Sequence, residues 1–236
     1  MSERLNVLSI DWDYFIDASA SDRLMLFPDG GNENLSNSIQ DIIWMGRYNN
    51  EDLAAVKSDS TAVRLVKSIL KKTDARYMIV DSHKYAYDFI VDNMNEYCKY
   101  SLNLVNIDFH HDVYENGSCV DCGNWLAKII EIYKEGSSFT WVGREDSDVS
   151  YRDDIGLKFT TSLDVVSEYT WDIVFICRSG MWSPPHLDER FRSMFNWVTK
   201  HYTTKYQKDI FTDRYRRVKK LCGEYGVKSV LRHQDW

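Results

Sequence analysis

Short runs of apolar residues recur along this chain, and the segments between them carry apolar residues three or four positions apart. The runs with the length of buried strands are residues 6–10, 76–80, 102–107, 139–142 and 171–176. Helical spacing marks a helix that opens at Ser60 and the segments 85–97, 124–134, 187–202 and 205–222. Strands that alternate with helices predict an α/β fold, in which a mainly parallel sheet lies between two layers of helices.

A chain of 236 residues is long enough for one α/β domain with a large core. We therefore expect a single domain over residues 1–236. Residues 16–58 are less regular than the rest, and residues 27–32 have the composition of a turn. We expect this stretch to be an excursion from the sheet that lines the functional site.

Acidic residues and histidines follow the predicted strands where each strand ends. They are Asp11 and Asp13 after the first strand, His83 after the second, and Asp108, His110 and Asp112 after the third. The carboxyl ends of parallel strands meet at one edge of an open sheet, which is where such folds place their sites. Carboxylates so close together repel one another unless a cation or a shared proton lies between them, and a cation is the simpler arrangement. Mixed imidazole and carboxylate ligands suit manganese, iron or zinc better than calcium.

Polar residues at strand ends have another common use, because their side chains cap loops and helix N-termini. For a single Asp-x-Asp pair, capping is the simpler interpretation. Asp108, His110 and Asp112 alternate along one strand end and therefore converge in one space. Together with the other two strand ends, this triple favours a metal site.

The formal net charge of −7 argues against nucleic acid as a partner and favours a cationic substrate. The one strongly basic run, residues 214–220, has helical spacing and is interpreted as a solvated helix face. Aromatic residues make up 14% of the chain, which suits a large core and also a surface that grips a peptide or protein.

Five cysteines without a regular spacing indicate reduced thiols. No signal-peptide pattern opens the chain, and no apolar run approaches the ~18 residues that a membrane span requires. These features predict a cytoplasmic protein without a membrane partner, which could form a homo-oligomer.

Several of these motifs resemble those of the arginase and ureohydrolase superfamily. Residues 108–112, Asp-Phe-His-His-Asp, resemble its Asp-x-His-x-Asp signature, and residues 9–13, Ser-Ile-Asp-Trp-Asp, are similar to its Ser-Phe-Asp-x-Asp signature. Residues 80–83 resemble the segment with the family's first histidine ligand, and residues 122–125 and 141–146 resemble two further family segments. The resemblance covers residues 9–146.

The chain departs from ordinary arginases in the order of its motifs. The Asp-x-Asp strand stands at the N-terminus here, as in a divergent branch that includes peptide arginases of ribosomal peptide biosynthesis. Residues 176–180 lack the aspartates that ordinary arginases place there, and the histidine that follows Gly-Asn in the family is absent after Asn124. The usual proton shuttle is therefore missing from its motif.

The resemblance implies a hydrolase with two divalent metal ions, for which we expect Mn²⁺. Asp108 and Asp11 would bridge the ions, His83 and Asp112 would complete one site, and His110 and Asp13 would complete the other. The divergent branch converts arginine residues of a precursor peptide to ornithine and releases urea. An arginine-containing peptide is therefore the expected partner.

Other roles have several candidates in this sequence. The proton shuttle is expected to be His111 or His186, and the acid that holds the guanidinium group Glu145, Asp188 or Glu189. Asn124, Trp125 and Tyr114 are candidate substrate contacts, and Trp12, Trp125 and Trp182 are expected to offer aromatic surface to a peptide. Glu115 follows Tyr114 in the loop after the Asp-x-His-x-Asp motif, and its charge would repel the α-carboxylate of free arginine.

Two other functions fit parts of the sequence. A phosphatase of the haloacid dehalogenase type would use Asp11 as nucleophile, but it requires a late acidic pair and leaves the histidines unexplained. A catalytically silent arginase-like module that binds a peptide or protein would explain the missing histidine. Metal content separates this module from the enzyme.

Overall fold

The computed structural model describes residues 4–27, 33–71, 74–97, 101–115, 117–151, 153–206 and 213–227. Its centre is a seven-stranded sheet in which every paired strand runs parallel to its neighbour, with the order β7-β6-β5-β1-β8-β4-β9. The strands are β1 (Arg4–Asp11), β4 (Arg76–Val80), β5 (Ser101–Ile107), β6 (Ser138–Val142), β7 (Leu157–Thr160), β8 (Ile173–Cys177) and β9 (Thr204–Tyr206). Strands β2 (Ile16–Asp17) and β3 (Lys57–Ser58) form a separate antiparallel pair.

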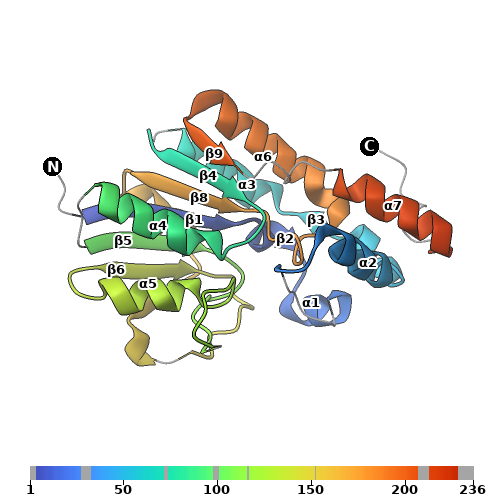
Figure 1. Ribbon diagram of the computed structural model, residues 1–236, viewed down its shortest axis with the longest axis horizontal. Helices are drawn as coiled ribbons and strands as arrows, with labels where there is room; N and C mark the ends of the chain where they lie inside the picture. Colours follow the sequence, from blue (N-terminus) through green and yellow to red (C-terminus); the bar gives the residue numbers. More distant parts are fainter. Residues whose placement is uncertain are drawn as a thin grey trace.

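Helices cover both faces of the sheet, which gives the three-layer α/β/α arrangement (Figure 1). The α-helices are α1 (Ala20–Leu26), α2 (Asn37–Arg47), α3 (Ser60–Leu70), α4 (Tyr85–Glu96), α5 (Trp125–Tyr133), α6 (Asp188–His201) and α7 (Arg214–Tyr225). Helices α4 and α5 lie on one face, and α3 and α6 on the other, whereas α1, α2 and α7 gather beyond the carboxyl ends of the strands. None of the helices within the described ranges combines the length and the apolar character of a membrane span.

Alternation along the strands divides the core into two halves. In β5, Leu102 and Leu104 pack with the helices α4 and α5, whereas Val105 and Ile107 pack with the other half. Strand β8 alternates in the same way and is buried at all of its positions. A central parallel strand needs apolar residues on both faces, which explains why the sequence shows continuous apolar runs here.

The sequence predictions for β1, β4, β5, β6 and β8 and for α3, α4, α5 and α6 are confirmed, with shifts of a few residues at the ends. The short edge strands β7 and β9 were not predicted. The predicted helix over residues 205–222 is wrong at its start, because residues 204–206 pair with β4 and the helix begins at Arg214, capped by Asp213. Residues 207–212 and most of the expected turn at 27–32 lie outside the described residues.

The irregular stretch 16–58 contains α1, α2, a short 3₁₀ helix (Glu51–Ala55) and the β2–β3 pair. Helix α2 is tied to the loop after β8, because Trp44 Nε1 donates to the carbonyl oxygen of Gly180 at 2.8 Å. The Arg47 guanidinium donates to the carbonyl oxygen of Met181. The stretch therefore stands at the carboxyl edge of the sheet, as expected of an excursion that lines the site.

Candidate metal centre

The strand register brings the predicted ligands to one level of the sheet. Ile10 of β1 is paired with Ile107 of β5 and with Ile176 of β8. The residues that follow these strands, beginning with Asp11 and Asp108, therefore leave the sheet side by side. His83 lies in the loop after β4, the strand that neighbours β8 on the side away from β1.

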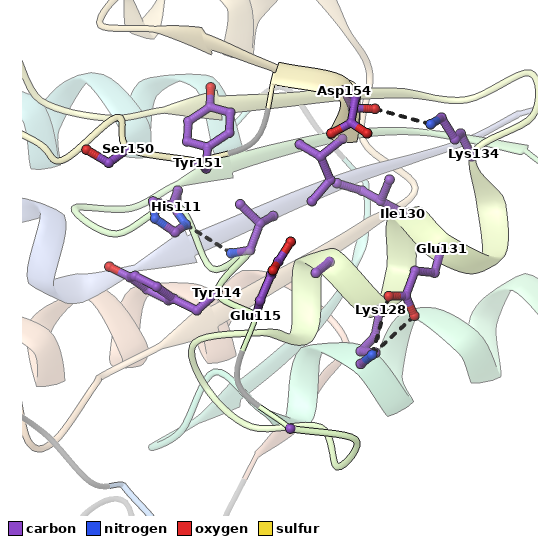
Figure 2. Close-up of a pocket in the computed structure, with 14 residues that line it drawn as sticks. His111, Tyr114, Glu115, Lys128, Ile130, Glu131, Lys134, Ser150, Tyr151 and Asp154 are labelled. Carbon is purple, nitrogen blue, oxygen red and sulfur yellow. Dashed lines mark hydrogen bonds and ion pairs between the residues drawn. The ribbon is translucent and has the colours of Figure 1, made fainter.

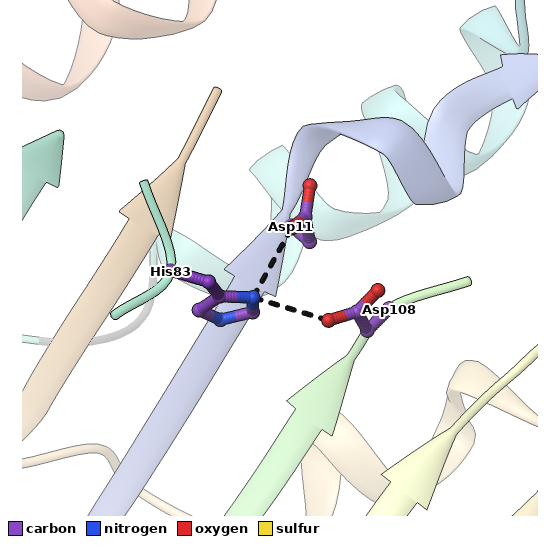
Figure 3. A group of neighbouring side chains, drawn as sticks. All are labelled: Asp11, His83 and Asp108. Atoms are coloured by element: carbon purple, nitrogen blue, oxygen red, sulfur yellow. Dashed lines mark ion pairs between the residues drawn. The ribbon is translucent and has the colours of Figure 1, made fainter. Parts of the chain in front are cut away.

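His83 is the centre of a first group of ligands. Its Nδ1 atom lies 3.1 Å from a carboxylate oxygen of each of three aspartates, Asp11, Asp108 and Asp112. Figure 3 shows Asp11 and Asp108 converging on this nitrogen from two neighbouring strand ends. Nδ1 has no well-directed hydrogen bond, and one proton could not serve three carboxylates. All four side chains are buried, so a shared cation is the arrangement that balances them.

His110 is the centre of a second group. Its Nδ1 atom lies 3.1 Å from Asp13 Oδ2 and 3.8 Å from Asp108 Oδ1. Asp108 thus turns one oxygen toward His110 and the other toward His83. The two groups share this carboxylate and form one continuous centre. We call the six side chains Asp11, Asp13, His83, Asp108, His110 and Asp112 the metal-ligand cluster.

The protonation of the cluster shows how unbalanced its charges are without a cation. Burial, together with the charges of Asp13 and Asp108, raises the pKa of Asp11 to about 7. Burial and the charge of Asp112 raise the pKa of Asp108 well above its usual value. Burial opposes the charged form of His110, yet Asp13 raises its pKa to about 9. In the absence of a metal ion, these raised pKa values favour proton binding by the ligands, which supplies the positive charge that an ion would otherwise provide.

The pKa values of His83 and Asp13 follow the same logic. Burial works against a charged imidazole, but Asp108, Asp11 and Asp112 raise the pKa of His83 well above its usual value. For Asp13, burial is outweighed by His110 and Arg23, which lower its pKa. His110 and Arg23 thus favour the charged form of Asp13.

Neighbouring side chains orient the ligands. Ser9 Oγ lies 2.7 Å from His83 Nε2, so a proton on Nε2 leaves the Nδ1 lone pair directed at the aspartates. Trp125 Nε1 donates to Asp112 Oδ2 at 2.6 Å, and Ser179 Oγ donates to Asp11 Oδ2 at 2.5 Å. A ligand that is held by a fixed donor keeps its geometry whether or not a metal is bound.

Two residues at the cluster have left-handed backbones that are uncommon outside glycine. Asp112 has a φ of 53° and Ser179 a φ of 50°. Such conformations cost of order 1–3 kcal/mol and occur preferentially at functional sites. Both residues direct their side chains into the cluster, where Asp112 meets His83 and Ser179 meets Asp11.

Glu33 is a site residue that the sequence patterns did not reveal. Its Oε2 accepts a hydrogen bond from the backbone N–H of His83 at 3.1 Å, while Oε1 is buried and has no well-directed hydrogen bond from the described residues. Burial, together with the charge of Asp11, raises the pKa of Glu33 to about 8. Glu33 belongs to the irregular stretch and follows no strand, so strand-end reasoning could not find it. Its only sequence signal is an acid beside a turn in the predicted excursion.

The structure argues against the three acids that the sequence suggested for guanidinium binding. The Asp188 carboxylate is already held by two arginines of the chain, Arg214 at 2.5 Å and Arg178 at 3.5 Å. Glu189 is exposed and pairs with Arg192, one turn along α6. Glu145 is exposed in the loop after β6. These carboxylates are engaged by the chain itself or face solvent.

The two candidate proton shuttles are also placed unfavourably. His111 is buried beside the cluster, and burial lowers its pKa to about 4, so it is neutral at pH 7 and does not carry a spare proton. His186 lies between Tyr48 Oη at 2.7 Å and the carbonyl oxygen of Val56 at 2.9 Å, so both of its ring nitrogens are engaged. Neither position favours a proton shuttle.

The candidate substrate contacts divide into buried and accessible residues. Trp125 is 0% exposed and orients Asp112, and Trp12 is 1% exposed, so the prediction that they offer surface to a peptide is wrong. Asn124 is buried and holds its own loop, because Oδ1 accepts from the N–H of Asp121 and Nδ2 donates to the carbonyl of Cys119. Tyr114 is 39% exposed and Trp182 is half-buried beside His110.

No known family model matches this sequence, and searches of curated proteins and of solved structures likewise found no match. The site must therefore be interpreted from its own geometry. The described structure brings all six predicted ligands together in two groups that could hold a metal ion; five of them are buried and His110 is partly buried.

Proposed function

We propose that this protein is a hydrolase with two divalent metal ions that acts on the guanidinium group of arginine residues in a peptide. The observation that carries the proposal is Asp108, whose two carboxylate oxygens face separate histidine-centred groups. A carboxylate shared in this way is what a pair of adjacent ions requires. The resemblance of residues 108–112 and 9–13 to arginase signatures supports the same conclusion.

The residues divide between two ions as follows. His83, Asp11 and Asp112 would hold one ion, His110 and Asp13 would hold the other, and Asp108 would contact both. Mixed nitrogen and oxygen ligands make Mn²⁺ the favoured ion. A pair of such ions activates water near neutral pH and stabilises the charge that develops during hydrolysis.

The proposed reaction adds water across the guanidinium carbon of arginine. The bond from this carbon to the side-chain nitrogen breaks, the nitrogen gains a proton, and ornithine and urea result. The guanidinium carbon is a poor electrophile because resonance stabilises it, so the reaction depends on a strong nucleophile and on precise orientation of the group.

Glu33 is the carboxylate that we assign to orient the guanidinium group. Its Oε1 is buried next to His83 and has no well-directed hydrogen bond from the described residues, so a bound cation would supply a donor to this acceptor. Carboxylates bind guanidinium groups by charge-assisted hydrogen bonds. Glu33 therefore replaces Glu145, Asp188 and Glu189 in this role.

A peptide is preferred to free arginine for two reasons. Glu115 is exposed in the loop that follows Asp112, where its charge opposes the α-carboxylate of the free amino acid. An internal arginine of a peptide has no α-carboxylate. The net charge of −7 also favours the approach of a basic peptide, an effect that salt weakens.

The test combines metal analysis with an assay of urea. Purified protein is loaded with Mn²⁺, its bound metal is counted, and urea release is measured from free arginine, agmatine and an arginine-containing peptide. We expect about two ions per chain and the highest catalytic efficiency on the peptide. Bound metal without urea from any of the three would favour the silent peptide-binding module. Release of phosphate from a phosphate ester, with no urea, would favour the phosphatase.

A further inference from the structure

A cavity of about 760 Å³ lies beside the metal-ligand cluster. The loop after Asp112 forms one wall of this cavity, helix α5 forms another, and the segment around Tyr151 forms the third (Figure 2). We call it the Tyr114 cavity, after the aromatic residue of the first wall. Its volume is within the range of about 300–1,000 Å³ that is common for ligand sites.

The Tyr114 cavity borders the metal-ligand cluster at His111. His111 stands between the ligands His110 and Asp112 in sequence and lines the cavity. The centroid of its ring lies 4.1 Å from that of Tyr114 and 5.4 Å from that of Tyr151, and both ring pairs are tilted. Tyr114 stands two residues after the ligand Asp112 and lies beside His111 in the lining of the cavity. The lining of the cavity and the metal-ligand cluster therefore share one segment of the chain, residues 110–114.

His111 also presents an unused hydrogen-bond donor. Its Nδ1 accepts from the backbone N–H of Val113 at 3.1 Å, which places the imidazole proton on Nε2. Nε2 is buried and has no hydrogen-bond partner among the described residues. A buried donor without an acceptor costs about 1–3 kcal/mol, and a carbonyl group of a ligand would remove that cost.

The walls of the Tyr114 cavity favour an uncharged side chain. Ile130 and Ile155 supply apolar surface, and the rings of Tyr114 and Tyr151 add aromatic surface. The two lysines of the lining are engaged by the chain, because Lys128 Nζ lies 3.2 Å from Glu131 and Lys134 Nζ donates to the carbonyl of Asp154 (Figure 2). The lining holds three carboxylates, those of Glu115, Glu131 and Asp154, against these two ammonium groups, so an acidic ligand is disfavoured.

We infer that the Tyr114 cavity binds the substrate residue next to the modified arginine and selects an aromatic or aliphatic side chain at that position. This inference rests on the proposed function, since it places the arginine at the metal-ligand cluster. It adds a recognition site that explains how a peptide is chosen by its sequence as well as by its arginine.

The test measures binding and urea release separately on the Mn²⁺-loaded full chain. The probes are capped tetrapeptides with one arginine, in which both neighbours of the arginine are Phe, Gly or Asp. We expect the Phe peptide to bind about 10-fold more tightly than the Gly peptide in calorimetry, as for a side chain buried at a binding hot spot. The Asp peptide should bind more weakly than the Gly peptide.

Two substitutions connect this preference to the cavity. Ala127→Trp fills the cavity from α5, and Tyr151→Ala removes one aromatic wall. Either change should abolish the advantage of Phe over Gly. Ile132→Trp is the matched control, because Ile132 is exposed on the same helix outside the cavity lining, and it should keep the preference. Metal content of each variant checks that Asp112, whose carbonyl accepts from the N–H of Ala127, is undisturbed.

The outcomes separate the inference from the proposed function. If the wild-type chain prefers the Phe peptide and both cavity variants lose this preference, the inference is supported. This holds even if no peptide releases urea, because the absence of urea would overturn the proposed function and leave the binding site in place. Equal binding of Phe and Gly peptides overturns the inference, even if urea is released from both. A preference that survives in Tyr151→Ala and Ala127→Trp also overturns it. If Ala127→Trp does not fold, the binding preference of Tyr151→Ala alone decides whether the inference holds.

Discussion

Two groups of buried charges stand at the carboxyl edge of the sheet, and they are balanced in different ways. The first is the metal-ligand cluster. The second, which we call the arginine network, consists of Asp81, Arg178, Asp188 and Arg214. The two groups are adjacent along the chain, because Asp81 precedes His83 by two residues and Arg178 directly precedes Ser179.

The arginine network balances its charges internally. Arg178 donates to both oxygens of Asp81 at 2.7 Å, and Arg214 donates to both oxygens of Asp188. Gly180 allows this close packing, since a Cβ atom there would lie 2.8 Å from Asp81 Oδ1. Two aspartates are thus matched by two arginines. The interpretation of residues 214–220 as a solvated face is therefore wrong for Arg214, which is buried in this network.

The metal-ligand cluster lacks such internal balance. Within the described ranges its four aspartates face two histidines, and the one arginine paired with them is Arg23, which lies 3.7 Å from Asp13. The difference teaches that buried acids alone do not indicate a metal site. What distinguishes the cluster is the deficit of positive charge together with nitrogen atoms that lie among the carboxylates.

The largest effect is expected for Asp108→Asn, which removes the shared carboxylate. The neutral amide cannot hold two cations, so bound metal should fall well below the wild-type content and urea release should drop by about 1,000-fold or more. Metal analysis and the urea assay measure both quantities. Asp52→Asn, at an exposed position of the first 3₁₀ helix after α2, is the matched control. Full metal content in Asp108→Asn would contradict the shared-ligand arrangement.

Arg178→Met tests the arginine network. It leaves the buried carboxylate of Asp81 without its partner, so the free energy of unfolding should fall by about 3–5 kcal/mol. Denaturant unfolding of the metal-free chain measures this change in the free energy of unfolding. Adding Asp81→Leu should recover much of the loss, because no unpaired charge then remains. A double variant no more stable than Arg178→Met would show that the network does not act as a balanced pair.

The same pair predicts a dependence on pH. Burial opposes the charged form of Asp81, but Arg178 outweighs it and lowers the pKa of this carboxyl below 3.8. Its contribution to stability is thus present above pH 3.8 and is lost as the pH falls through the lower pKa of the folded state. Acid unfolding of the wild-type chain and of Arg178→Met should converge at low pH. Parallel curves would contradict this assignment.

Metal binding should stabilise the chain through the metal-ligand cluster alone. With free Mn²⁺ at 100 times its dissociation constant, the gain is about 2.7 kcal/mol. For a chain of 236 residues this corresponds to a rise in Tm of roughly 5–10 °C. Thermal unfolding with and without a chelator measures it. Arg178→Met should show the same rise from a lower Tm, whereas Asp108→Asn should show little.

The smallest effect is expected for Trp125→Phe, which removes the hydrogen bond to Asp112 and keeps the ring in the core. Loss of such an orienting partner typically weakens metal binding by about 10-fold to 100-fold. Metal titration of the variant measures the change. Trp171→Phe removes an indole hydrogen bond to a backbone carbonyl far from the ligands and serves as the control. Equal metal affinity in both variants would mean that Asp112 needs no orienting donor.

Local patterns in the sequence were sufficient for the layers of the fold and for the six candidate ligands. Apolar runs identify central parallel strands because these strands are buried on both faces, and polar residues after them must emerge at one edge. The edge strands β7 and β9 were not predicted from the sequence because they are short, and β7 is largely exposed. Periodicity is weak in a strand that has one neighbour and little burial.

Only the tertiary structure decided the roles that depend on contacts between distant segments. Glu33 approaches His83 across 50 positions of the chain, and Arg178 engages Asp81 across 97. Other contacts of the folded chain hold Trp125 against Asp112, 13 positions away, and Asp188 against Arg214, 26 positions away, so neither is available to a substrate. Spacing within a strand is set by the repeat of the backbone and can be read locally. The availability of a side chain depends on what packs against it, and only the folded chain determines that.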